Sequence, residues 1–318
     1  MSFPILRVLL VEDNPNDAEL ILRELKKANG YQIIHERVET EDAFKQVLHR
    51  LVWDFIICDY SLPQFSAERA LELIAGYGLD MPFILVSGKI TQEQAQKVLG
   101  RRTVRGFVSK GELSNFGALF RREIELSKRY DDALQFFVQV LGIRDRETKG
   151  HSERVTDMTV ALARHMGFSE IDIIQIRRGA LMHDIGKMGV PDALLLKPGK
   201  LDPDEMWLMR QHPKIGYDLL VENEWMKHIL DIPYCHHERW DGSGYPRGLK
   251  GEEIPIAARI FAVVDNYDAM TSDRPYRAGM PPLSVLVYIR EQSGKMFDPE
   301  VVKAFLEMME PQNGVKSN

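Results

Sequence analysis

The sequence has little cysteine and no long apolar run. Its 318 residues include two cysteines, Cys58 and Cys235, which lie far apart along the chain. Such low cysteine use is typical of the reducing cytoplasm, and we expect no disulfide framework. No stretch of about 18 apolar residues occurs, and the first residues, MSFPILRVLLVED, lack the layout of a signal peptide. We therefore predict a soluble, cytoplasmic protein that does not span a membrane.

A surplus of basic residues is also missing. The chain has 41 Lys and Arg residues against 47 Asp and Glu, which gives a net charge of −6. That balance argues against broad binding to nucleic-acid polymers or acidic membranes, although a local basic cluster would still hold a small anion. Nothing after residue 280 reads as a basic recognition helix, so a transcription factor is not predicted. The length suggests about two domains.

The first third of the chain alternates apolar runs with segments of helical spacing. Each run ends on polar residues, as buried parallel strands do when they open into a site. The runs cover residues 6–13, 54–59, 82–88 and 105–110. Helical spacing occurs between them, at residues 15–28, 40–50, 66–76 and 91–100. This alternation predicts an α/β, doubly wound parallel sheet.

The polar residues that follow these strands suit phosphoryl chemistry. Glu12 and Asp13 are placed to hold Mg²⁺ together with Asp59, while Ser87 and Lys110 are placed to contact an anion beside Asp59. A phosphoryl group on Asp59 needs this combination of carboxylate nucleophile, metal ion and cation.

Residues 5–125 therefore resemble the receiver domain of bacterial two-component response regulators, including Pro63 after Asp59 and Phe107 before Lys110. Gly111 stands where a proline usually follows the lysine. The resemblance implies that Asp59 is the phosphoacceptor, that Ser87, Phe107 and Lys110 form the switch, and that a cognate histidine kinase is a partner. The alternative is an unphosphorylated receiver that serves as a dimerisation scaffold.

A long helix is predicted after the receiver. Residues 116–148 contain no proline, and apolar residues recur at helical spacing: Leu119, Leu126, Tyr130, Leu134, Phe137 and Leu141. The spacing is compatible with a dimeric coiled coil, hence with a homodimer, but equally with a helix that packs within its own chain. The predicted organisation is a receiver over 1–125, a helical connector over 126–148 and a second domain over 149–318.

The second domain is predicted to be mostly helical and to contain histidines and carboxylates in apolar or glycine-rich segments. Such side chains point inward and need partners, and a metal ion satisfies several at once. Glu147 and His151 share one helical face if the connector runs through both. Asp184, next to His183, is placed to bridge two metals. The set indicates a metallohydrolase and comprises Glu147, His151, His183, Asp184, His212, His236, His237 and Asp265.

With their surroundings, these residues resemble the HD-GYP family, a subgroup of the HD-domain metal-dependent phosphohydrolases. The resemblance covers residues 130–308 and includes LMHDIGKMGVPDALLLKPGKL, HHERWDGSGYPRGLKGEEIP, RPYR and GKMFDPEVVKAF. It implies hydrolysis of cyclic di-GMP to pGpG, GMP or both, with all eight residues above as ligands. It also implies two or three metals, and the presence of Glu147 favours three. A ligand set without cysteine suits iron or manganese.

Substrate contacts are expected around this centre. Asp184 and Lys187 are the expected catalytic residues, and Lys187 is also expected to reach a phosphate oxygen. Arg274 and Arg277 are candidates for the second phosphate. In the family, the loop over 241–251, with Gly244, Tyr245 and Pro246 here, is credited with contacting substrate and diguanylate cyclase domains. Two alternatives stay open: a phosphodiesterase for cyclic GMP-AMP, and a non-catalytic dinucleotide sensor.

Overall fold

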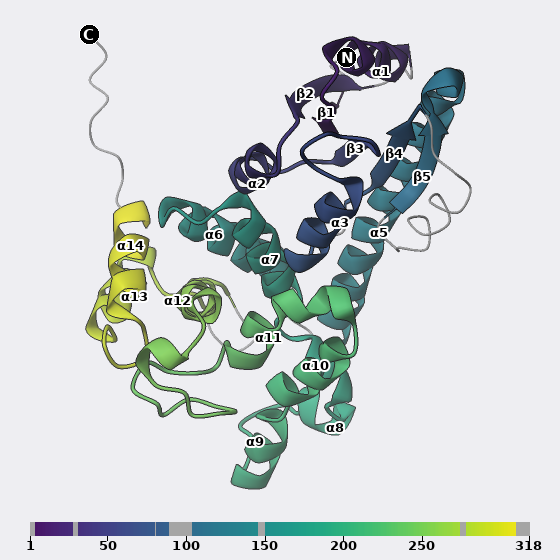
Figure 1. The fold of residues 1–318 in the computed structure, drawn as a ribbon. Helices are drawn as coiled ribbons and strands as arrows, with labels where there is room; N and C mark the ends of the chain where they lie inside the picture. Colours follow the sequence, from purple (N-terminus) through teal and green to yellow (C-terminus); the bar gives the residue numbers. More distant parts are fainter. Residues whose placement is uncertain are drawn as a thin grey trace. The chain divides into compact units, whose positions relative to one another are not determined.

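The computed structural model describes residues 4–27, 31–79, 81–88, 104–145, 150–273 and 278–309 (Figure 1). The chain divides after Leu134 into two compact units. The division falls within helix α5 (Phe116–Asp145), so this helix contributes residues to both units. The helix predicted over 91–100 lies outside the described residues, as do Glu147, Arg274 and Arg277.

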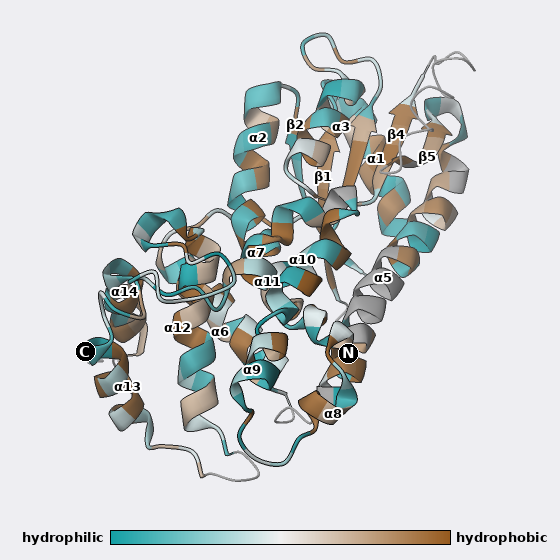
Figure 2. Ribbon diagram, turned by 90° about the horizontal axis from the view of Figure 1, so that it is seen from below, coloured by the Kyte–Doolittle hydropathy of each residue, from teal (hydrophilic) through white to brown (hydrophobic). Residues whose placement is uncertain are grey.

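The first unit is built on a five-stranded parallel sheet in the order β2-β1-β3-β4-β5. Its strands are β1 (Ile5–Val11), β2 (Gln32–Val38), β3 (Phe55–Asp59), β4 (Phe83–Ser87) and β5 (Val104–Ser109). Four of them match the predicted runs, and Figure 2 shows β1, β4 and β5 as largely hydrophobic. The edge strand β2 was not predicted. Most of its side chains are exposed or half-buried, so it has no continuous apolar run.

Helices cover both faces of this sheet. They are α1 (Pro15–Lys27), α2 (Glu41–Arg50), α3 (Ala67–Gly76) and the first half of α5. Thr40 and Ser66 begin α2 and α3 because their side chains accept hydrogen bonds from the backbone N–H groups three residues later. Phe116 and Phe120 of α5 pack with α1 in one buried cluster, which leaves α2 and α3 for the other face (Figure 1).

The second unit is helical. Its α-helices are α6 (His151–His165), α7 (Glu170–Leu181), α8 (Asp192–Leu195), α9 (Pro203–Met209), α10 (His212–Val221), α11 (Asp231–Cys235), α12 (Ile256–Thr271), α13 (Pro282–Glu291) and α14 (Pro299–Met309). The short 3₁₀ helices η2 (Ile185–Gly189), η3 (Glu224–Ile229) and η4 (Gly251–Glu253) lie between them, and in the first unit η1 (Lys110–Asn115) lies between β5 and α5. The apolar helix α12 is central and contacts α6, α11, α13 and α14. Its buried residues Ile260, Phe261 and Val264 belong to the main core.

Three helices end close to predicted metal ligands. Helix α7 ends at Leu181, so the His183–Asp184 pair lies in the turn that leads into η2. The segment over 203–220 breaks between α9 and α10, because Pro213 removes a backbone donor and its ring would crowd the carbonyl of Met209. Helix α5 ends at Asp145, and Gly150 has a φ of 77°, so the connector does not run as one helix into His151.

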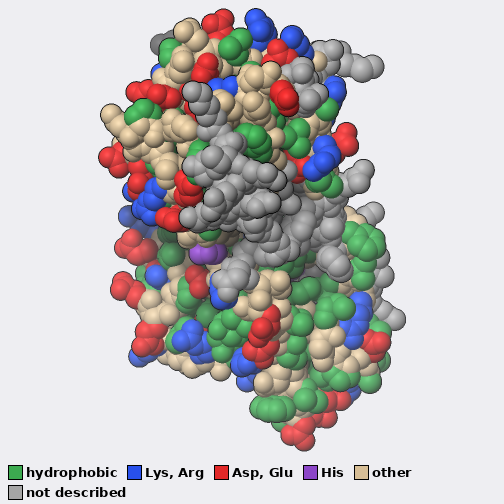
Figure 3. Space-filling model, turned by 45° about the vertical axis from the view of Figure 1, so that its right-hand side comes forward, with side chains coloured by type: hydrophobic (Ala, Val, Ile, Leu, Met, Phe, Trp, Pro, Cys, Tyr) green, Lys and Arg blue, Asp and Glu red, His purple; other side chains and the backbone are tan. Residues whose placement is uncertain are grey.

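The composition predicted no membrane-spanning segment and a surface with charges of both signs. Among the described residues, no helix combines the length and apolar character needed to cross a membrane. On the face drawn in Figure 3, Lys and Arg side chains are interspersed with Asp and Glu. Histidine shows little surface there, as the burial of most second-unit histidines requires.

Candidate metal centre and receiver pocket

Backbone carbonyls orient three histidines of the second unit. The Nδ1 atoms of His183, His212 and His236 lie 2.8, 2.8 and 3.0 Å from the carbonyl oxygens of Ala180, Met209 and Ile232. A carbonyl oxygen can only accept, so Nδ1 donates in each ring. In a neutral ring, Nε2 then carries the lone pair, which is the atom that binds a metal.

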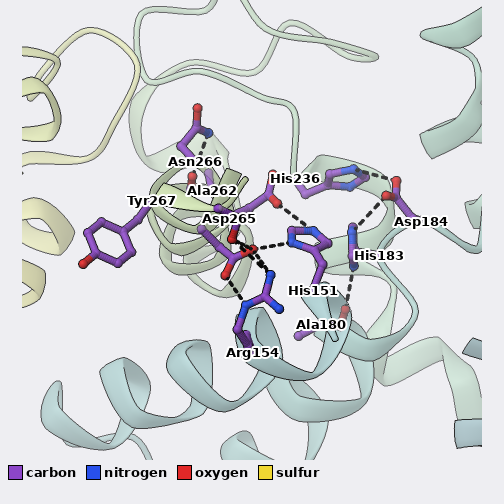
Figure 4. Close-up of polar contacts among 12 residues, drawn as sticks. His151, Arg154, Ala180, His183, Asp184, His236, Ala262, Asp265, Asn266 and Tyr267 are labelled. Atoms are coloured by element: carbon purple, nitrogen blue, oxygen red, sulfur yellow. Dashed lines mark hydrogen bonds and ion pairs between the residues drawn. The ribbon is translucent and has the colours of Figure 1, made fainter. Parts of the chain in front are cut away.

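The histidines and carboxylates form two groups on either side of Asp184. One comprises His151, His183 and Asp265 and the other His212, His236 and His237; within each, one ligand atom per residue lies within 4.8 Å of the others. Oδ2 of Asp184 lies 3.0 Å from Nε2 of His183. Its Oδ1 lies 3.2 Å from Nε2 of His212 and 3.7 Å from Nε2 of His236. The two oxygens of one carboxylate therefore face two different groups (Figure 4).

The spacing of these atoms fits a bound cation. Nε2 of His212 lies 3.3 Å from Nε2 of His236, although both rings already donate from Nδ1. Two lone pairs at that separation repel each other, and the carboxylate of Asp184 adds negative charge nearby. A divalent metal ion reverses each of these repulsions, so the residues present suit a metal.

Burial of the imidazoles and charges beside the carboxylates keep the donor atoms in the protonation state that metals need. Burial lowers the pKa of His236 to about 3, so this imidazole is neutral at pH 7. Burial alone would raise the pKa of Asp184, but Lys187 and His183 outweigh it and hold the pKa well below its usual range. Burial would also raise the pKa of Asp265, but the hydrogen bond with His151 acts against this effect, and the pKa lies below its usual value. Neutral rings and ionised carboxylates are the ligand forms of these groups.

Two residues that the sequence analysis missed hold His151 in place. Asp268, which is buried, lies 2.6 Å from Nδ1 of His151 through its Oδ2 atom. Arg154 donates from Nε to Oδ1 of Asp268 at 2.7 Å. Spacing could have identified both, because Asp268 is three residues after Asp265 on α12 and Arg154 three residues after His151 on α6. Such outer partners set ring orientation at metal sites.

Lys187 reaches the same centre from η2. Its Nζ atom lies 2.7 Å from Oδ2 of Asp184, and the lysine side chain is mostly buried. This position follows from a close backbone approach, because a Cβ on Gly186 would overlap the carbonyl oxygen of His212 in α10. A glycine is therefore required where η2 packs against α10.

The loop over 241–251 lies against the second histidine group. The ring of Tyr245 stacks on that of His237 with centroids 4.7 Å apart, and the guanidinium of Arg210 lies 5.1 Å from the Tyr245 ring. The Tyr245–Pro246 peptide bond is cis. Gly244 allows close packing rather than a turn, since a Cβ there would overlap the backbone of Glu238. The buried Glu238 accepts hydrogen bonds from two backbone N–H groups of this loop.

The structure therefore brings together seven of the eight expected ligands, and Glu147 lies outside the described residues. Arg274 and Arg277 also lie outside them. Cys235 is buried against Ile254 and Ala258, as expected for a packed core thiol.

A second acidic pocket lies at the carboxyl ends of the strands in the first unit. Carboxylate oxygens of Glu12, Asp13 and Asp59 lie within 4.8 Å of one another. Nζ of Lys110 lies 2.7 Å from Oδ2 of Asp59 and 2.9 Å from Oε2 of Glu12. Ser87, at the end of β4, is buried. Three carboxylates beside one lysine and a serine provide sites for a hard cation and for an anion.

Asp17 adds a further carboxylate beside Lys110. Asp17, in the first turn of α1, also pairs with Nζ of Lys110 and was not predicted. Its signal is its place in the first turn of the helix that directly follows β1, which brings it near the end of that strand. Phe107 is half-buried in β5.

Comparison with known proteins agrees with this two-part architecture. A family profile described as a response regulator receiver domain matches residues 8–115, and one described as an HD domain matches residues 135–301, over half of the chain. The chain is 45% identical over 192 residues to a cyclic di-GMP phosphodiesterase of Thermotoga maritima, covering 58% of this chain and 52% of that protein. It is 40% identical over 168 residues to 3′3′-cGAMP-specific phosphodiesterase 3 of Vibrio cholerae, covering 53% and 36%.

A third relative aligns over nearly the whole chain. It is described as a probable cyclic di-GMP phosphodiesterase of Vibrio cholerae and is 30% identical over 349 residues, covering 96% of this chain and 78% of that protein. The chain spans about half or less of the length of the other two relatives. The chain therefore belongs to the HD-domain family, in the HD-GYP group that its motifs indicate, and it is a response regulator with an N-terminal receiver domain.

Proposed function

We propose that this protein hydrolyses cyclic di-GMP at a multinuclear metal centre in its helical unit. The observation that carries the proposal is the position of Asp184, whose two oxygens face two separate groups of histidines at 3.0 and 3.2 Å. One carboxylate between two donor sets suits a pair of metals, and a pair of metals suits phosphodiester hydrolysis.

Each group would hold one metal, with Asp184 shared between them. His151, His183 and Asp265 would supply the first site and His212, His236 and His237 the second. Glu147 would contribute to a third site. The donors are nitrogen and oxygen without thiolate, which favours iron or manganese. Bound divalent metals would supply Lewis-acid activation of water and neutralisation of the phosphodiester charge.

The protein side chains would orient the substrate and provide the remaining charge. Lys187, 2.7 Å from Asp184, is placed to donate to a phosphate oxygen beside the centre. Tyr245 would contact the dinucleotide from the loop, together with Gly244 and Pro246. Burial raises the pKa of the Tyr245 hydroxyl to about 12, so it would act as a donor at neutral pH. Arg274 and Arg277 would bind the second phosphate. The expected products are linear pGpG, GMP or both.

The receiver unit would regulate this activity through phosphorylation. Asp59 would accept a phosphoryl group from a cognate histidine kinase, with Mg²⁺ held by Glu12, Asp13 and Asp59. Lys110 would pair with the phosphoryl group, while Ser87 and Phe107 would respond to it. Diguanylate cyclase domains and a second copy of the chain are further proposed partners.

A cyclic GMP-AMP dinucleotide is the second candidate substrate. It is favoured by the 40% identity to a 3′3′-cGAMP-specific phosphodiesterase. The chemistry at the phosphodiester is the same for both dinucleotides, so only the residues that contact the bases would distinguish them.

The test combines metal analysis with turnover. The full chain is purified without oxygen, its iron and manganese content is measured, and hydrolysis of both dinucleotides is followed by chromatography. We expect at least two metals per chain and faster turnover of cyclic di-GMP. Asp184→Ala should lose metal and activity while its circular dichroism stays helical. Asp218→Ala, which removes a surface partner of Lys214 on α10, should retain both. Full activity of metal-depleted Asp184→Ala would overturn the proposal.

A further inference from the structure

Arg144, in the last turn of α5, makes several hydrogen bonds to the segment that follows the His183–Asp184 pair. Nη1 of Arg144 donates to the carbonyl oxygens of Lys187 and Met188 at 2.9 and 3.1 Å, and Nη2 donates to that of Val190 at 2.7 Å. Nε of the same guanidinium donates to Oδ1 of Asp192 at 2.9 Å. One side chain therefore serves three backbone acceptors within residues 187–190 and the first residue of α8.

These carbonyls belong to the end of a very short helix. The 3₁₀ helix η2 has five residues, so its last carbonyl groups have few partners within the helix. A cation at a helix C-terminus stabilises such groups, and the planar fork of arginine serves several acceptors at once, which lysine cannot do. The opposite side of η2 is fixed by the close approach of Gly186 to α10.

Lys187 is carried by the segment held in this way. Its carbonyl oxygen accepts from Arg144, while its Nζ atom lies 2.7 Å from Asp184. The backbone N–H of Lys187 also donates to the carbonyl oxygen of Asp184 at 2.9 Å. A shift of η2 therefore changes both the lysine and the carboxylate at the centre.

We propose that Arg144 is a positioning residue that holds Lys187 beside Asp184 for phosphodiester hydrolysis, an inference that rests on the proposed function. Arg144 makes no contact with the ligand groups themselves in the described residues. It acts through the backbone of η2. The helix that carries Arg144 begins among receiver core residues such as Phe116.

A double-mutant cycle in the full, metal-loaded chain tests this inference. Arg144→Ala, Lys187→Ala and the double variant are compared with the wild type, using cyclic di-GMP and, in parallel, bis(p-nitrophenyl) phosphate. We expect Arg144→Ala to lower kcat/KM roughly 10- to 100-fold without loss of metal, because small misplacements of catalytic groups have effects of that size. The double variant should be no worse than Lys187→Ala alone, since Arg144 acts through that lysine. Losses that multiply in the double variant overturn the proposal.

Hydrogen exchange gives a readout that does not depend on turnover. The amides of residues 185–190 should exchange faster in Arg144→Ala than in the wild type, and unchanged exchange would overturn the proposal even if neither substrate is hydrolysed. Absence of wild-type turnover on cyclic di-GMP would instead count against the proposed function. Arg144→Lys replaces Arg144→Ala if the latter does not fold. Arg164→Ala, which removes an ion pair between α6 and Glu170 of α7, should change neither readout.

Discussion

Hydrogen bonds from individual side chains to the backbone determine which atoms of the second unit are available to bind a metal. Backbone carbonyls take the Nδ1 protons of His183, His212 and His236, and this directs their Nε2 atoms toward the centre. The same principle holds at the loop over 241–251. Oε1 of Glu238 accepts from the backbone N–H of Arg247 at 2.7 Å, and Oε2 accepts from that of Leu249 at 3.0 Å. Glu238 is buried, so water cannot replace either bond.

Glu238→Gln is expected to loosen this loop. An amide presents an NH₂ group to one of the two backbone donors, and a buried unsatisfied donor costs about 1–3 kcal/mol of unfolding free energy. Because Tyr245 lies in the same loop, we also expect KM for cyclic di-GMP to rise several-fold while metal content stays constant. Urea unfolding and steady-state kinetics measure the two effects.

Glu253→Gln is the matched control for this prediction. Its carboxylate also accepts from a backbone N–H of the loop, that of Lys250, but it is exposed to water. Its loss should therefore cost less than about 0.5 kcal/mol. Equal effects of the two variants would show that Glu238 does not anchor the loop.

Among the elements, η2 has the greatest influence on the centre. This short helix places Lys187 beside Asp184, and its packing on α10 brings Asp184 near His212. The contact is between two backbones, with Gly186 on one side and the carbonyl oxygen of His212 on the other. A Cβ added at this contact would clash with backbone atoms, and backbone atoms cannot move aside by a change of rotamer.

Gly186→Ala is therefore expected to destabilise the helical unit and to disturb metal binding. Overpacking in a tight contact costs about 1–3 kcal/mol or more, and separation of η2 from α10 would move Asp184 away from His212. Thermal unfolding and metal analysis measure these effects. The control is Gly142→Ala within α5, where an added Cβ meets nothing within 4 Å. That variant should be neutral or slightly stabilised, because alanine favours helix over glycine. Similar melting temperatures for both variants would contradict the argument.

At the scale of the whole molecule, helix α5 is shared by the two units. It begins in the receiver core with Phe116 and Phe120, and its last turn carries Arg144. The sequence analysis placed Glu147 and His151 on one helical face only if this helix ran through both, and the positive φ of Gly150 interrupts it before His151.

We expect beryllofluoride with Mg²⁺, a mimic of the phosphoryl group, to change turnover or dimerisation of the wild-type chain. A switch of this kind needs to bias two existing arrangements by only a few kcal/mol. Asp59→Asn should lose the response and keep its metals, because it removes the phosphoacceptor and leaves the helical unit intact. Rate measurements and light scattering test both properties. Identical responses of the two proteins would make the receiver a scaffold rather than a switch.

Local patterns were sufficient to predict much of the architecture. Buried parallel strands such as β3 and β4 are apolar throughout, so the apolar runs predicted them and placed Asp59 and Ser87 at their ends. The edge strand β2 faces solvent over most of its length and left no such signal. The break before His212 could have been predicted from Pro213, but apolar spacing alone concealed it.

The grouping of the site residues was decided by tertiary structure. Sequence spacing shows which side chains share a face of one element, and it identified the histidines and carboxylates because their neighbours are apolar. It does not show which elements meet. The separation into two groups around Asp184, the support of His151 by Asp268 and the hydrogen bonds of Arg144 to η2 join residues up to 117 positions apart. Such pairs arise only when helices pack, because packing fixes distances that chain connectivity leaves open.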